Sequence, residues 1–172
     1  PDVEQYSIDE SFIDMTGTEQ LFGEPLKVAH IIKDRIYREL GFTVNVGIST
    51  NKLLAKMASD FKKPNLVHTL FPEEISVKMW PLPVSELFFV GRQTTKRLHS
   101  LGIFTIGDLA NTDKKIIHDN LKGHGDVIWE FANGISDNMD EVASRHKKPA
   151  NKGYSNQTTL PFAVTDATFA KE

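Results

Sequence analysis

The stretch EQYSIDESFIDMTGT, residues 4–18, places two adjacent carboxylates inside a run of residues that favour a β-strand. Its aromatic and β-branched residues predict a strand over residues 5–15. Asp9 and Glu10 occupy positions where such a strand normally contributes to a core. Because successive side chains along a strand point to opposite faces, the two acids can share one site only at a strand end, a turn or a bulge. We therefore expect Asp9 and Glu10 to lie beside a tight β-turn at the open edge of a sheet.

Composition indicates an ordinary globular chain of one domain or two small ones. It has 172 residues, of which 40% are apolar and 25% are charged. No apolar run approaches the roughly 18 residues needed to span a membrane, and no signal-peptide pattern is visible. The absence of cysteine excludes disulfides and thiolate metal sites. We expect a cytoplasmic protein with no membrane partner. Because the chain begins abruptly, a few residues before a strand, we also expect it to be a piece of a longer protein.

Charge is distributed unevenly along the chain, although the net charge is only −3. Residues 1–26 carry seven acids and neither lysine nor arginine. The basic residues cluster later, at Lys52, Lys56, Lys62 and Lys63; at Arg92, Lys96 and Arg97; and at Arg145, Lys147, Lys148 and Lys152. Such local patches decide whether phosphates are bound, and the total charge does not. For any single cluster, a solvated helix face is an equally good explanation.

The first 70 residues predict a sheet unit of the α+β or α/β class. An apolar stripe, an early Pro25 and a terminal Gly41 predict a helix over residues 25–40. The predicted order is a strand at 5–15, this helix, a strand at 42–48, a helix that begins at Ser49 or Thr50 and stops by Pro64, and a strand at 66–70. This β-α-β-α-β order is typical of a sheet flanked by helices.

Prolines break up the chain after residue 71, and the remaining pattern predicts a small all-helical domain. The predicted helices are at 73–80, 84–88, 94–101, 106–110, 113–121 and 125–133, and glycines close three of them. Residues 144–153 are basic and polar with one proline and one glycine, which suits a linker. We therefore expect the α+β fold class, with a partial sheet unit followed by a helical domain.

The helix NKLLAKMASDFKKP, residues 51–64, carries a candidate phosphate site. Lys52, Lys56 and Lys63 are spaced by four and seven residues, so they share one stripe of the helix. Aligned ammonium groups beside a sheet can hold a triphosphate. An exposed helix face explains the spacing equally simply and is the commoner case. Pro64 disfavours helical geometry at Lys63, so this side chain can point back over the sheet.

The stretch LPVSELFFVGRQTTKRLHSLGIFTIGDLA, residues 82–110, resembles a helix-hairpin-helix motif. A glycine lets backbone approach a phosphate closely, and the N–H groups at a helix start supply donors. Such contacts hold duplex DNA without reading its bases. The candidate contact residues are Gly91, Arg92, Thr94, Lys96 and Arg97. The usual hairpin is Gly-hydrophobic-Gly, but here the first glycine position is occupied by Phe89. An ordinary helical hairpin is the alternative.

Taken together and in this order, three stretches carry a family resemblance: YSIDESFIDMTGT, VNVGISTNKLLAKMASDFKKPN and LPVSELFFVGRQTTKRLHSLGIFTIGDLA. They resemble the Y-family translesion DNA polymerases of the bacterial DinB/UmuC type, over nearly the whole chain. The resemblance implies that residues 1–70 are the later part of a palm domain and that residues 71–143 are a thumb. It implies that residues 144–172 are a linker and the start of a little-finger domain.

The same resemblance implies roles for individual residues. Asp9 and Glu10 match the pair that binds two catalytic Mg²⁺ ions, and Lys63, with Lys56 as a weaker match, corresponds to the lysine that contacts the incoming dNTP. The thumb residues named above would grip primer–template DNA. The family's first metal-binding aspartate and its fingers are absent from this chain, so we expect no polymerase activity from residues 1–172 alone. Whether the protein also recruits a sliding clamp, through regions that this chain does not contain, stays open from the sequence.

Three functions remain open from the sequence. The first is a template-directed DNA polymerase acting in DNA damage tolerance, including the SOS response, in which two metal ions clamp the attacking 3′-oxygen and the leaving pyrophosphate. The second is a non-catalytic duplex-DNA-binding module that uses the helical domain, with the sheet unit purely structural. The third is a palm-like nucleotidyl cyclase, which the helical hairpin disfavours.

Overall fold

The first strand of the sequence is in fact a β-hairpin. The computed structural model describes residues 1–135. In it β1 (Asp2–Gln5) pairs antiparallel with β2 (Ser11–Asp14), and residues 6–10 connect the two. The prediction of one strand over residues 5–15 is therefore wrong, because short polar side chains in the connection bond to nearby backbone and favour a turn. The expected turn beside the two acids is confirmed.

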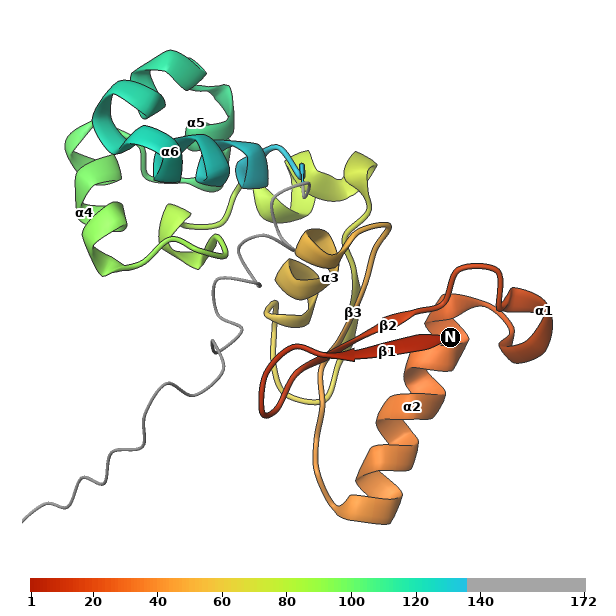
Figure 1. Cartoon of the computed structure of the whole chain (residues 1–172). Helices are drawn as coiled ribbons and strands as arrows, with labels where there is room; N and C mark the ends of the chain where they lie inside the picture. Colours follow the sequence, from red (N-terminus) through yellow and green to blue (C-terminus); the bar gives the residue numbers. More distant parts are fainter. Residues whose placement is uncertain (136–172) are drawn as a thin grey trace, which may run out of the picture.

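The sheet unit continues with two helices, two short strands and one further helix. The elements are α1 (Glu19–Phe22), α2 (Pro25–Leu40), β3 (Val46–Ile48), α3 (Lys52–Ser59) and β4 (Val67–Thr69). β3 and β4 form a parallel pair, and among the described residues they are not hydrogen-bonded to the first hairpin. Figure 1 shows the hairpin crossing beside β3, with α2 on one side and α3 on the other.

Local signals explain the bounds of these helices. Pro25 stands at the first turn of α2, and Gly41 ends it in the left-handed conformation, as predicted. α3 is capped by Asn51, whose side chain accepts a hydrogen bond from the Leu54 backbone N–H at 2.9 Å. The expected cap at Ser49 or Thr50 is therefore wrong by one or two residues. Both expected strands, at 42–48 and 66–70, are shorter than their patterns predict.

α3 lies unusually close to β3 because of Gly47. A Cβ atom at this position would come within 1.9 Å of the Ala55 carbonyl oxygen, so only glycine fits between the strand and the helix. This contact leaves Leu53, Leu54 and Met57 fully or almost fully buried. The opposite face of α3, which carries the lysines, is turned towards the hairpin.

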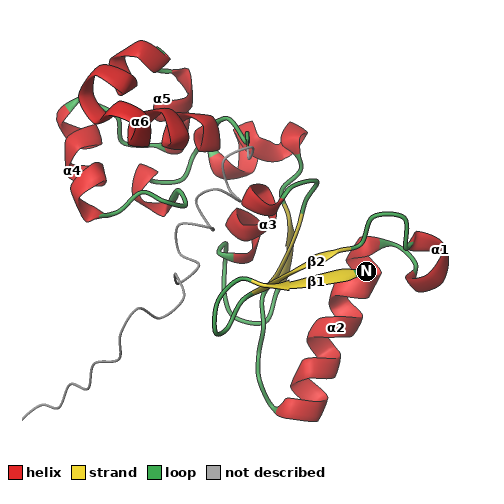
Figure 2. Cartoon of the chain, viewed as in Figure 1, coloured by secondary structure: helices red, strands yellow, loops and turns green. Residues whose placement is uncertain are grey.

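The second half of the described chain is helical, as predicted. Its elements are η1 (Pro72–Glu74), the π-helical η2 (Ile75–Met79), η3 (Val84–Glu86), α4 (Arg92–Ser100), α5 (Ile106–Asn111) and α6 (Lys114–Ala132). α6 takes the place of the two helices predicted at 113–121 and 125–133, and non-helical backbone at Lys122 breaks it between them. Figure 2 shows these helices grouped away from the strands. The predictions for residues 136–172 lie outside the described residues.

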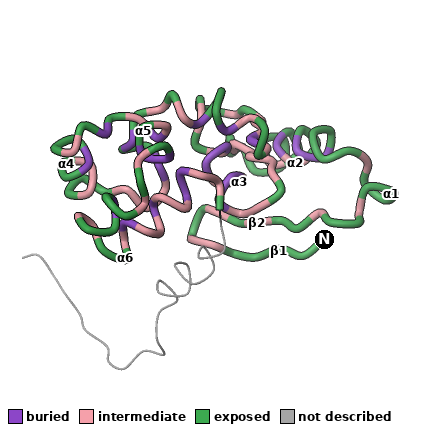
Figure 3. Tube along the Cα trace, turned by 90° about the horizontal axis from the view of Figure 1, so that it is seen from above, coloured by how far each residue is buried: buried purple, intermediate pink, exposed green. Residues whose placement is uncertain are grey.

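One hydrophobic core joins the two halves. It runs from α3 through Leu70 and Met79 to Ile128 and Phe131 of α6. Figure 3 shows that the buried residues concentrate along α3, α5 and α6, whereas the β1–β2 hairpin is largely exposed. The Trp80 indole N–H also donates to the Ala132 carbonyl at 3.0 Å. Among residues 1–135, no helix is long and apolar enough to cross a membrane.

Candidate functional site

The turn between β1 and β2 brings two carboxylates together. The backbone N–H groups of Tyr6 and Ser7 both donate to the Glu10 carbonyl, at 2.9 and 3.1 Å, and this closes the turn. The Ser7 hydroxyl then lies 2.8 Å from Asp9 Oδ1 and 3.5 Å from Glu10 Oε2. It has one proton to donate, so it bonds Asp9 and stays within reach of Glu10. Adjacent acids that a regular strand would separate thus share one edge of the molecule.

Lys56 ties the turn to α3. Its ammonium lies 2.7 Å from Glu10 Oε1 and 2.6 Å from Asp60 Oδ2, and its side chain is only 13% exposed. Burial alone would lower the pKa of Lys56, but its hydrogen bonds to the two carboxylates outweigh burial and raise this pKa above its usual value. Lys56 is therefore a cation already neutralised by two carboxylates of the protein.

Lys63 extends this chain of ion pairs to the surface. Its ammonium lies 2.8 Å from Asp60 Oδ1, and its side chain is 59% exposed. Burial would raise the pKa of Asp60, yet the hydrogen bonds from Lys56 and Lys63 lower it. Glu10, Lys56, Asp60 and Lys63 thus form one continuous network that runs from the turn to the end of α3.

The sequence reasoning found three members of this network and missed Asp60. Its signal was present, because Asp60 follows Lys56 by four residues and precedes Lys63 by three, and both spacings favour contact on a helix. Lys52, the third lysine of the stripe, turns instead to Glu4 of β1 at 2.8 Å. The predicted three-lysine stripe is therefore correct only for Lys52 and Lys56, because α3 ends at Ser59 and Lys63 lies beyond it. Each of the three lysines contacts an acid of the protein.

The donor set at the turn is that of a hard divalent cation. Mg²⁺ takes carboxylate oxygens together with water and substrate phosphate, so two carboxylates fit part of its coordination shell. Within residues 1–135, no group of three or more acidic, histidine or cysteine side chains gathers to complete a metal site. Asp9 and Glu10 therefore fit the metal as two of its ligands, and no third acidic, histidine or cysteine side chain of residues 1–135 joins them.

The helical hairpin presents a different surface. Gly91 is the N-cap of α4 and is exposed, and a Cβ atom placed on it would meet no atom within 4 Å. Arg92 and Lys96 are also exposed, and neither makes an ion pair with any residue that the structure describes. Arg97 donates to Asn120 Oδ1 of α6 at 2.9 Å. The first turns of α4 therefore combine an exposed glycine backbone with cations that have no acidic partner among the described residues.

Thr94 and Phe89 of the helical hairpin both contact α6. The Thr94 hydroxyl lies 3.2 Å from His124 Nε2 of α6. Phe89 has a φ of 74°, the left-handed conformation that glycine would adopt freely. Phe89 thus carries a bulky side chain in a backbone conformation that glycine adopts freely.

An aromatic contact connects the turn with the helical hairpin. The Tyr6 ring lies 5.2 Å from that of Phe12 and 6.5 Å from that of Phe88, and Phe88 lies 6.3 Å from Phe89. Burial, with the Glu10 carboxylate as a second cause, raises the pKa of Tyr6. The two candidate regions are therefore neighbours in space, although about 80 residues separate them in the sequence.

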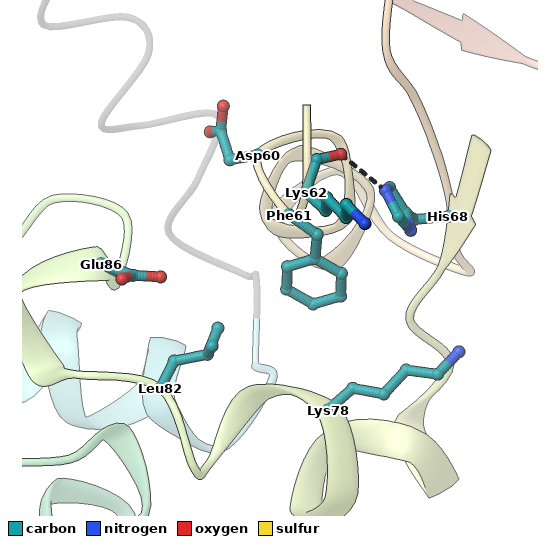
Figure 4. A pocket seen from close by; sticks show the side chains of 7 residues that line it. All are labelled: Asp60, Phe61, Lys62, His68, Lys78, Leu82 and Glu86. Carbon is teal, nitrogen blue, oxygen red and sulfur yellow. Dashed lines mark hydrogen bonds between the residues drawn. The ribbon is translucent and has the colours of Figure 1, made fainter. Parts of the chain in front are cut away.

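A cavity of about 500 Å³ lies at the far end of α3, apart from these residues (Figure 4). Its lining consists of Asp60, Phe61, Lys62, His68, Lys78, Leu82 and Glu86. The Phe61 ring points into the cavity, and His68 Nε2 lies 2.9 Å from the Lys62 carbonyl oxygen. The lining carries charges of both signs, and it meets the candidate site only through Asp60. The geometry therefore gives this cavity no part in the site.

Comparison with protein families identifies two matching segments. The model described as the impB/mucB/samB family matches residues 1–60, and the model described as the IMS family HHH motif matches residues 72–103. The first segment contains the carboxylate turn and α3. The second contains the helical hairpin and α4.

Curated relatives match across almost the whole chain. A protein named DNA polymerase IV from Clostridium acetobutylicum is 53% identical over 167 residues, which cover 96% of this chain and 41% of the relative. A DNA polymerase IV from Alkaliphilus oremlandii is 43% identical over 166 residues, again covering 96% of this chain and 41% of the relative. The chain thus spans about two fifths of the length of these relatives.

Solved structures share the same fold. The insertion ternary complex of Dbh DNA polymerase matches with a TM-score of 0.67 and 29% identity, over 77% of this chain and 39% of that one. The crystal structure of DinB from Sulfolobus solfataricus matches with a TM-score of 0.66 and 28% identity, over 77% and 39%. The arrangement of the β1–β2 hairpin, α3 and the helices after residue 71 is therefore one that other proteins also adopt.

Proposed function

The chain belongs to the DinB-type Y family of DNA polymerases, the impB/mucB/samB family, and on this premise we propose that the full-length protein is a translesion DNA-directed DNA polymerase. The observation that carries the proposal is the turn of residues 6–10. It gathers Asp9 and Glu10 around one hydroxyl, beside a lysine-bearing helix. In this proposal the substrates are primer–template DNA and a dNTP.

Asp9 and Glu10 bind the catalytic Mg²⁺, two ions in the full-length enzyme. When bound, the metal would neutralise phosphate charge and stabilise negative charge on the attacking 3′-oxygen. Ser7 holds the Asp9 carboxylate in place, and Lys56 holds that of Glu10. Because little covalent work falls to the protein in nucleotidyl transfer, such positioning is the main contribution of these side chains.

Lys63 is the residue that we assign to the triphosphate. It is far more exposed than Lys56, and its ion pair with Asp60 is at the surface, where exchange for a phosphate costs little. Lys56 can reach a nucleotide only by giving up one of its two carboxylates. We therefore assign Lys56 mainly to the support of Glu10, with nucleotide contact as a secondary role.

The helical domain holds the duplex in this proposal. Gly91 allows a phosphate to approach the start of α4, where free backbone N–H groups point outward. Arg92 and Lys96 add unpaired charge, and Arg97 and Thr94 contribute from the same helix. In domain terms, residues 1–70 serve as the later palm, 71–143 as the thumb, and 144–172 as the linker and start of the little finger.

The experiment that tests this function replaces Asp9 and Glu10 by alanine in the full-length protein. Primer extension with Mg²⁺ and dNTPs should be abolished, while the Kd for primer–template DNA should stay within about twofold of the original, because the grip lies elsewhere. Glu4→Ala is the matched control, since Glu4 is an acid of the same hairpin that pairs with Lys52. Undiminished extension by the double variant would falsify the assignment.

A second function, a non-catalytic duplex-DNA-binding module, is favoured by the unpaired cations of α4 and by the two-carboxylate donor set within residues 1–135. Metal titration separates the two functions. A binding module is indifferent to Mg²⁺ with dNTP and loses DNA affinity when Arg92, Lys96 and Arg97 are neutralised. A polymerase shows tighter nucleotide binding in the presence of Mg²⁺, and that gain disappears in the Asp9→Ala, Glu10→Ala protein.

A further inference from the structure

The hairpin before α4 contains a residue in a conformation that its side chain does not favour. Phe89 has a φ of 74°, where an L residue with a bulky side chain meets its own backbone. The next glycine, Gly91, has an ordinary φ of −89°. The turn therefore depends on Phe89, and surrounding contacts must hold Phe89 in this conformation.

Three aromatic rings surround the Phe89 side chain. The Phe88 ring lies at 6.3 Å, the Phe131 ring at 6.4 Å and the His124 imidazole at 4.9 Å, measured between centroids. Phe131 is fully buried, whereas His124 is half-buried. Of the three rings, the His124 imidazole thus has the shortest centroid distance to Phe89.

The same imidazole also reaches the first turn of α4. His124 Nε2 lies 3.2 Å from Thr94 Oγ1, and burial lowers the pKa of His124. The neutral ring, in the tautomer protonated at Nδ1, accepts a hydrogen bond that the Thr94 hydroxyl donates to Nε2. His124 follows the break in α6 at Lys122, where φ is 56°. The break is therefore what aims an α6 side chain at the hairpin and at α4 together.

We propose that His124 is a positioning residue for the DNA-backbone contact, which with Phe89 forms a clasp that holds residues 88–91 in a glycine-like turn. The clasp fixes where Gly91 and the start of α4 present their N–H groups. A glycine at position 89 would adopt this turn through its conformational freedom. Here side-chain packing around Phe89 takes the place of that freedom. The inference rests on the proposed function, since it assigns to the helical hairpin a hold on duplex phosphates.

The test is a double-mutant cycle on the full-length protein. The measured quantity is the Kd for a fluorescein-labelled primer–template duplex at one salt concentration, at pH 7.5, well below the melting temperature of every variant. His124→Ala should weaken binding about fivefold, which is what loss of one ordinary hydrogen bond does to an equilibrium constant. In a Phe89→Gly background, the same substitution should cost less than about twofold, because glycine needs no clasp.

Two further variants separate positioning from general damage. His124→Gln keeps a side-chain acceptor for Thr94 and should recover part of the lost affinity. His99→Ala is the matched control, because His99 also stacks on a phenylalanine, Phe104, at 5.1 Å, but from the last turn of α4. It should leave the Kd unchanged.

Each outcome bears on the clasp. Equal losses from His124→Ala in both backgrounds, or no loss in either, would overturn it. Failure of the proposed function gives a different pattern, in which neutralising Arg92 and Lys96 also leaves the Kd unchanged. If those cations matter and the cycle is additive, the DNA grip stands and the clasp does not.

Discussion

The lysines in and just after α3 differ from the cations of α4 in whether the protein itself neutralises them. Lys52, Lys56 and Lys63 each face a carboxylate of the protein, so their charge is neutralised before any ligand arrives. Arg92 and Lys96 face no acid within the part of the chain that the structure describes. Paired charges hold their side chains in fixed positions, whereas unpaired charges attract a polyanion over a distance.

This difference teaches which region supplies order and which supplies affinity. In the carboxylate turn, an ion-pair network sets the geometry that chemistry needs. In the helical hairpin, uncharged packing around Phe89 sets the geometry and leaves the cations free. Each region can therefore be perturbed through the interaction that holds it, while the other region serves as the control.

The largest effect on stability is expected at Gly47, the glycine of β3 that packs against α3. Gly47→Ala would place a Cβ 1.9 Å from the Ala55 carbonyl oxygen and force β3 and α3 apart, at a cost of about 3 kcal/mol or more. Gly91→Ala meets no atom within 4 Å, so it should lower the free energy of unfolding by less than about 1 kcal/mol, the loss from a poorer N-cap. Urea denaturation of the two variants measures both values. A Gly47→Ala protein as stable as the original would contradict the close packing of strand and helix.

A smaller loss is expected when the network loses its central cation. Lys56→Met removes the shared partner of Glu10 and Asp60 and leaves their carboxylates facing one another. Because both acids are partly exposed, we expect a destabilisation of about 1–2 kcal/mol, less than for a fully buried pair. Lys115→Met is the control, since Lys115 pairs with Asp119 on an exposed face. Equal losses for the two variants would remove the special role of Lys56.

Acid should disturb the two regions at different pH. Because the pKa of His124 is lower in the folded protein than in the unfolded chain, the unfolded chain binds a proton at higher pH than the folded protein does. The stability that neutral His124 contributes is therefore lost as the pH falls below about 6.5. The lowered pKa of Asp60 has its effect further down, as the pH falls below about 3.9. Melting temperatures measured from pH 8 to 3 should show the first decline flattened in His124→Gln and the second unaffected. A profile identical to the original would contradict the neutral state of His124.

The smallest effect on stability is expected at the unpaired cations. Arg92→Gln with Lys96→Gln breaks no contact among the described residues and should change the free energy of unfolding by less than about 0.5 kcal/mol. Its effect appears in DNA binding, where the slope of log Kd against log salt should fall by about two. An unchanged slope would mean that these cations do not meet phosphates.

The sequence predicted local features well where the cause was local. The bounds of α2 follow from Pro25 and Gly41, and the turn at Asp9 and Glu10 follows from the impossibility of two adjacent acids sharing one face of a strand. Spacing also predicted that Lys52 and Lys56 share one face of α3, and it contained the signal for the pairs of Asp60 with Lys56 and Lys63. What spacing could not reveal was the more distant acids, because Glu4 and Glu10 come from a hairpin more than 40 residues away.

The helical hairpin shows a second limit on what the sequence can predict. Propensity argues against a positive φ at Phe89, so its glycine-like turn could be predicted only by knowing what packs around it. That partner, His124, lies 35 residues later and reaches the hairpin through a break in α6. The sequence predicts the break itself, from Gly123, as the gap between helices at 113–121 and 125–133, but it does not predict that the break directs His124 at Phe89. The domain boundaries and the roles of the site residues remain predictions.

The most direct test of the division between the two regions is single-turnover incorporation of one dNTP by the full-length protein, measured across DNA concentration. We expect Asp9→Ala with Glu10→Ala to abolish the maximal rate and to leave the DNA concentration for half-saturation unchanged. We expect Arg92→Gln with Lys96→Gln to raise that concentration and to leave the maximal rate unchanged. If both double variants change the same quantity, chemistry and grip are not divided between the carboxylate turn and the helical hairpin.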